Sequence, residues 1–73
     1  MNQKELSELL LLNRELEIGK VRVQDYIDNE ISITIWPDDF YVYKMGMHGS
    51  HKFDGFCELD EVLSHLVFPV EII

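Results

Sequence analysis

Residues 31–45, ISITIWPDDFYVYKM, contain the pattern that decides the fold. Isoleucine occupies alternate positions from residue 31 to residue 35, which is the period-two pattern of a strand with one buried face. Pro37 interrupts this strand and begins a turn, because proline has no backbone N–H to give to a sheet ladder. Aromatic and β-branched residues follow over 40–45 and favour a second strand. The stretch therefore predicts a β-hairpin.

Two further strand segments flank this hairpin. Residues 21–27 alternate valine with polar residues, and a turn over 28–30 joins them to the hairpin. Residues 51–56 form a short fourth strand after a turn that contains two glycines, and Gly55 is an expected bulge. Because the links between the strands are short, antiparallel hairpins are favoured over crossovers.

A helix is expected at each end of the chain. Leucines at helical spacing predict a first helix that ends near Leu16, with Asn2 and Glu5 as a capping box and Gly19 as the left-handed residue after it. Apolar residues at i, i+3, i+4, i+7 and i+8 predict a second helix over 59–67, which a proline then ends.

The order helix, strands, helix predicts one α+β domain over residues 1–73. We expect an antiparallel sheet of three to four strands, with the C-terminal helix packed on one sheet face as a two-layer sandwich. The residues expected in the core are Ile31, Ile33, Ile35, Phe56, Leu59, Leu63 and Leu66.

The charge of the chain is strongly one-sided. Acidic residues number 14 and basic residues 6, which gives a formal net charge of -8. Residues 25–39 hold five acids and no base, and no base follows Lys52. A field of one sign selects partners by charge and disfavours direct binding to nucleic acid phosphates or anionic lipid. We therefore expect a partner protein with a basic surface, and neither nucleic acid nor membrane.

The expected contact surface combines these acids with aromatic residues on the strands. Trp and Tyr anchor interfaces because they join a large apolar area to a polar group. The alternative is an ordinary half-exposed strand face, with the acids serving solubility. The residues predicted to bind the partner are Asp25, Asp28, Glu30, Trp36, Asp38, Asp39, Tyr41 and Tyr43.

A metal or thiol site is a third hypothesis. His48, His51, Asp54 and Cys57 recur at intervals of three, and their side chains suit zinc. Residues three apart on a strand point to opposite faces, however, so these four converge only through a loop or bulge. Cys57 with His51 or His65 offers a thiolate pair, although a lone cysteine is usually buried in a core. We expect no metal, no cofactor and no enzymatic activity.

A homo-oligomer is the alternative to a partner-binding module. The four leucines from residue 9 to residue 12 cover more of a helix than one small sheet can bury. We expect a homodimer to form through Leu9, Leu11 and Leu12, or through the Val67 to Ile73 tail. The single cysteine and the lack of a signal peptide or a span of ~20 apolar residues favour a cytoplasmic location.

The chain resembles known proteins in two respects. The segment Phe56 to Leu63 is similar to the phrase Phe-x-x-Leu-x-Glu-Ala-Leu near the end of many small bacterial and phage proteins. The helix, sheet, helix order with strong acidity also resembles, in architecture alone, some phage-encoded anti-CRISPR inhibitors that imitate DNA. The first resemblance carries no function, whereas the second implies an inhibitor or regulator from a phage or other mobile element. Its target would be a basic surface, such as that of a nucleic-acid-binding protein.

Overall fold

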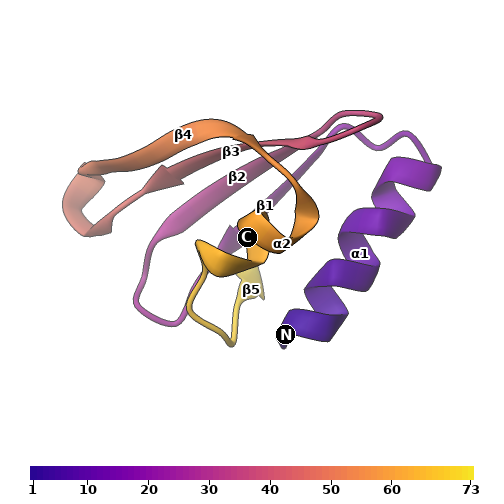
Figure 1. Ribbon diagram of the computed structural model, residues 1–73. Coiled ribbons are helices and arrows are strands. Elements are labelled where there is room, and N and C mark those ends of the chain that lie inside the picture. Colours follow the sequence, from indigo (N-terminus) through magenta and orange to yellow (C-terminus); the bar gives the residue numbers. More distant parts are fainter.

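The computed structural model describes residues 1–73 as an antiparallel sheet with both helices on one of its sides (Figure 1). The elements are α1 (Gln3–Glu15), β1 (Lys20–Gln24), β2 (Glu30–Ile35), β3 (Phe40–Met45), the 3-10 turn η1 (Met47–Gly49), β4 (His51–Cys57), α2 (Leu59–Ser64) and β5 (Glu71–Ile72). The strand order is β4-β3-β2-β1-β5. The predicted α+β class is confirmed.

Alternate strand residues face the helices and form the core. In β2, for example, Ile31 and Ile33 are fully buried, whereas Ser32 and Thr34, which alternate with them, are half-buried on the other face. The core comprises Leu6, Leu10, Val21, Val23, Ile31, Ile33, Phe40, Val42, Cys57, Val62, Leu63, Leu66 and Val70. The second face of the sheet carries no helix (Figure 1).

One predicted core residue lies on the wrong side of the sheet. Phe56 is 61% exposed, because it pairs with Tyr41 and shares the uncovered face with it. The next residue, Cys57, takes the buried position instead. Ile35 and Leu59 are partly buried against the core, and the other four predicted residues are within it.

A fifth strand corrects the expected count of three to four. Strand β5 pairs antiparallel with the end of β1, where Gln24 lies opposite Glu71. Val70, just before it, is fully buried, and its N–H donates to the Met1 carbonyl at 2.9 Å. The Met1 amino group donates in turn to the Val70 carbonyl at 2.8 Å. A strand of two residues is too short to show periodicity in the sequence.

The first helix begins as predicted and ends differently. Asn2 and Glu5 form the expected capping box, with N–H to side-chain distances of 2.9 and 2.8 Å. The left-handed residue after the helix is Glu17, with φ 58°, and the prediction for Gly19 is wrong. The Ile18 N–H donates to the Asn13 carbonyl at 2.8 Å, which closes a Schellman motif around Glu17.

Helix α2 is shorter than predicted and ends at Ser64. The Val67 N–H donates to a carboxylate oxygen of Asp25 at 3.3 Å and so does not continue the helical ladder. The Val67 carbonyl accepts from the Tyr26 N–H at 2.8 Å. The β1–β2 turn therefore takes up the backbone N–H and C=O groups of Val67, which a longer α2 would have used in its own hydrogen bonds.

The bulge in the sheet lies near the beginning of β4. The register shifts between Lys44 and Met45, which leaves Lys52 as the extra residue in β4. The prediction of a bulge at Gly55 is wrong, because Gly55 pairs with Val42 in regular register.

Candidate functional site

Five rings lie on the face of the sheet that no helix covers. We call them the aromatic face: Trp36, Tyr41, Tyr43, His51 and Phe56. Strand alternation directs the tyrosines away from the helices, because their neighbours in β3 are buried on the helix side. Trp36, Tyr43 and Phe56 are 48%, 40% and 61% exposed. The single tryptophan and two of the three tyrosines of the chain are thus gathered on its open side.

The rings contact one another in two groups. The Phe56 ring lies 5.0 Å from that of Tyr41 in an edge arrangement and 6.3 Å from that of Trp36, measured between ring centroids. Tyr43 and His51 stack with their centroids 5.3 Å apart. Edge and stacked geometries are the favourable ones for aromatic pairs. The rings therefore form an ordered surface and not a set of independent side chains.

One carboxylate links the two groups of rings. Asp54 accepts a hydrogen bond from the Tyr41 hydroxyl at 2.6 Å, and its other oxygen lies 2.9 Å from His51 Nε2. The bulge explains this arrangement, because the extra residue turns His51 and Asp54, three positions apart, to the same face. The hydrogen bond to Asp54 raises the pKa of Tyr41 above its usual 10.0. Neither His51 nor Asp54 was among the predicted contact residues.

Arg14 fixes the turn that carries Trp36. Its Nε donates to the Trp36 carbonyl at 3.1 Å and its Nη2 to the Asp39 carbonyl at 3.2 Å. The guanidinium carbon lies 4.2 Å from the centroid of the Phe40 ring. Helix α1 thereby holds the β2–β3 turn in place, and with it the first ring of the aromatic face.

Asp25 does not belong to an exposed surface, and its prediction as a contact residue is wrong. It is only 4% exposed. One carboxylate oxygen accepts from the N–H groups of Ile27 and Asn29 at 3.1 and 2.9 Å. The other accepts from the Asn29 side chain at 3.0 Å and from the Val67 N–H at 3.3 Å. Asp25 therefore organises the β1–β2 turn and ties it to the chain after α2.

The remaining predicted acids lie at two ends of the sheet. Asp28 and Glu30 are exposed at the beginning of β2, whereas Asp38 and Asp39 lie in the turn after it. A strand of six residues separates the two pairs by about 17 Å. The expected single acidic surface is therefore wrong, and the aromatic face runs between two acidic ends.

Few of these charges are neutralised by neighbours. The only side-chain ion pair joins His51 to Asp54, so no lysine or arginine lies within 4.0 Å of a carboxylate. Two cations do share the uncovered face, because Lys20 and Arg22 of β1 pair with its residues in β2. The face is thus aromatic over β3 and β4, where Asp54 is its only acid, and basic along β1.

The residues considered for a metal or thiol site do not come together. No three of the His, Cys, Asp and Glu side chains converge as a metal site would require. His48 is exposed in the turn before β4, and His65 stacks on Phe53 on the helix side with centroids 4.1 Å apart. Cys57 is buried; this burial, followed by the nearby carboxylates, raises the pKa of its thiol. A thiolate is therefore disfavoured at this position.

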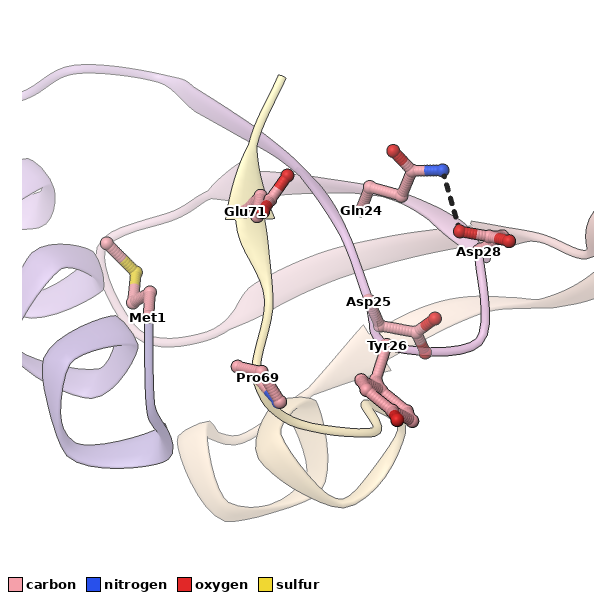
Figure 2. A pocket seen from close by; sticks show the side chains of 7 residues that line it. All are labelled: Met1, Gln24, Asp25, Tyr26, Asp28, Pro69 and Glu71. Carbon is pink, nitrogen blue, oxygen red and sulfur yellow. Dashed lines mark hydrogen bonds between the residues drawn. The ribbon is translucent and has the colours of Figure 1, made fainter.

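The cavity at the β1–β5 end of the sheet has a volume of about 410 Å³ (Figure 2). Gln24 donates to Asp28 across one side of it at 3.3 Å. Glu71 of β5 lies on the opposite strand, and Asp25 directs its carboxylate into the turn (Figure 2). The cavity is polar and open, and its one buried carboxylate is already satisfied by the backbone.

The leucines predicted for self-association divide between core and surface. Leu9 is partly buried against the core, so less of its side chain is exposed than is the case for Leu11 and Leu12. Leu11 and Leu12 are 46% and 48% exposed on the outer side of α1. In the C-terminal tail, Val70 is buried within the fold, whereas Ile73 is exposed at its end.

Comparison with known proteins gives no relative: no protein family matches the chain, and no curated protein or solved structure is detectably similar to it. None of its helices is long and apolar enough to cross a membrane.

Proposed function

We propose that this protein is a small acidic binding module that applies its aromatic face to another protein and has no enzymatic role. The observation that carries the proposal is the exposure of Trp36, Tyr43 and Phe56 on the same uncovered sheet face, where Trp36 and Phe56 are neighbours. Rings of this kind supply most of the energy at protein interfaces when a partner buries them. A group of them that no other element covers favours a partner.

The charge around the aromatic face specifies the kind of partner. Asp28 and Glu30 lie at one end and Asp38 and Asp39 at the other, within a chain of net charge -8. Complementary charges at the rim of an interface raise the association rate and fix the register. The partner therefore carries basic groups that reach both ends of the face. The rings supply the buried area, and the acids steer.

The proposed biological role is inhibition or regulation of a cytoplasmic protein, by a product of a phage or another mobile element. Its support is the small size, the acidity and the binding surface described above. Because the two acidic ends lie about 17 Å apart, this surface does not favour imitation of an unbroken line of phosphates. A basic protein surface, whether or not it binds nucleic acid, satisfies the charge requirement.

A pair of matched variants tests this proposal. Trp36→Ser with Phe56→Ser removes two exposed rings from the aromatic face, and Tyr26→Ser with Leu12→Ser removes two side chains of similar exposure elsewhere. In pull-downs from host lysate, the protein captured by the unmodified chain should be lost with the first variant and retained with the second. Equal capture by both, with native circular dichroism, would refute the aromatic face as the contact surface.

The salt dependence of capture distinguishes electrostatic steering by the acidic ends from packing of the exposed rings. Between about 0.1 M and about 1 M salt the Debye length falls from ~10 Å to ~3 Å, so capture should weaken clearly over this range. Capture that does not depend on salt would contradict the role given to the acidic ends.

Self-association through α1 is a second candidate, favoured by one observation. Leu11, Leu12, Leu16 and Ile18 are each about half exposed near the end of α1. A second copy that buried this patch would form an isologous dimer. Size exclusion coupled to light scattering tests this dimer. A monomer at all concentrations excludes it, and this result does not bear on the proposal that the aromatic face binds a partner.

A further inference from the structure

We infer that the partner adds an extended segment to the outer edge of β4 and so enlarges the sheet beside the aromatic face. This inference rests on the proposed function and names the way in which the partner binds. Strand β4 has seven residues and only one neighbour, whereas the other edge of the sheet is a strand of two residues. An uncovered edge strand presents unpaired N–H and C=O groups to another chain.

The β2–β3 hairpin determines which backbone groups of β4 are free. The Trp36 N–H donates to the Asp39 carbonyl at 3.0 Å and closes the hairpin. Bonded and non-bonded pairs alternate along an antiparallel ladder. Tyr41 and Tyr43 therefore direct their backbone groups toward β2, and Val42 between them directs its own toward β4.

The same alternation continues into β4. Gly55 pairs with Val42 and bonds back to β3. By this alternation the N–H and C=O groups of Asp54 and Phe56, on either side of Gly55, point away from β3, toward the side on which β4 has no neighbouring strand. The bulge at Lys52 ends this regular edge, so the open segment is the second half of β4. An added strand needs about five residues to pair with it.

Charge decides what kind of segment fits this edge. The side chains of Asp54 and Phe56 lie on the uncovered face, so alternate residues of an added strand would lie beside them. A residue opposite Asp54 is favoured when it is basic, and one opposite Phe56 when it is apolar. A second copy of this chain is a poor occupant, because it brings together two net charges of -8. The occupant is therefore a partner segment that alternates basic with apolar residues on one face.

Amide hydrogen exchange by NMR tests this mode of binding directly. In the free chain the amides of Asp54 and Phe56 should exchange much faster than that of Gly55. The probe is the blocked peptide Thr-Val-Thr-Arg-Thr, which offers valine and arginine on one face of a strand. At saturation it should protect the Asp54 and Phe56 amides at least about tenfold. The same peptide with Glu in place of Arg should bind roughly threefold more weakly or worse.

Two controls keep the outcomes distinct. A peptide N-methylated at its valine and arginine keeps its side chains, but methyl groups replace the N–H donors that face β4 and block close approach of the two strands, so it should not protect either amide. Shifts at the aromatic face without protection of the Asp54 and Phe56 amides would overturn strand addition and leave the proposed function standing. If the arginine peptide does not bind, strand addition is overturned as well. Failure of the proposed function is a separate result, which is equal capture of the partner by the two serine double variants.

Discussion

Replacing the carboxylate of Asp25 by an amide should destabilise the fold severely. The carboxylate is buried and accepts four hydrogen bonds, two on each oxygen. In Asp25→Asn one oxygen becomes an NH₂ group that faces two donors, so two bonds to a charged acceptor are lost and their N–H groups remain buried. At roughly 1.5 kcal/mol for each bond, the free energy of unfolding should fall by about 3 kcal/mol. In a domain of this size, that is a fall in Tm of about 12–24 °C.

The matched control is Asp28→Asn in the same turn. Asp28 is exposed, and asparagine tolerates its positive φ of 64°. Urea denaturation followed by circular dichroism should place this control within about 0.5 kcal/mol of the unmodified chain. If Asp25→Asn costs no more than the control, Asp25 does not organise the turn and the reasoning fails.

Three further predictions concern single side chains. Glu17→Gly should raise the free energy of unfolding by about 1 kcal/mol in urea titrations, because Glu17 is left-handed at φ 58°; a loss of stability would contradict the Schellman ending. Since burial raises the pKa of the Cys57 thiol, alkylation in the folded protein near neutral pH should be at least about tenfold slower than in urea, and equal rates would refute that burial. Asp54→Asn should lower the pKa of Tyr41 in an ultraviolet titration. The folded pKa of Tyr41 lies above its unfolded value of 10.0. The hydrogen bond from Tyr41 to Asp54 therefore stabilises the fold at pH values below 10.0, and this contribution is lost as the pH rises through the folded pKa.

Much of the fold follows from local pattern in the sequence. The bounds of β3 agree with the predicted 40–45, because proline and two aspartates before it and a glycine after it limit the strand on both sides. The capping box at the beginning of α1 is equally local. The element types were predictable wherever the deciding residues lie within a few positions of one another.

The errors arise from contacts between residues far apart in the sequence. Asp25 ends α2 early by accepting the N–H of Val67, 42 positions away. Strand β5 exists because Val70 reaches the core beside Met1, which no pattern of two residues reveals. The face on which Phe56 lies depended on the register of β4, and a register change of one residue moves a side chain to the opposite face.

The candidate site was predictable in part. Alternation places Tyr41 and Tyr43 on the same face of β3, and Trp36 was predicted with them as a contact residue. The structure adds that this face is the one that no helix covers. His51 and Asp54 were considered only for a metal or thiol site and not for the contact surface, because three-residue spacing on a regular strand places them on opposite faces. The bulge brings them to the aromatic face, and no residue in the sequence identifies that bulge.

Trp36 is the only tryptophan in the chain, so it reports on the aromatic face alone. The most direct test of partner binding through this face is fluorine NMR of protein labelled with 5-fluorotryptophan, with the captured partner added to saturation. The resonance should shift, and its displacement between H₂O and D₂O should disappear as the partner excludes solvent from the ring. A fully bound complex in which this solvent displacement is unchanged would contradict the account.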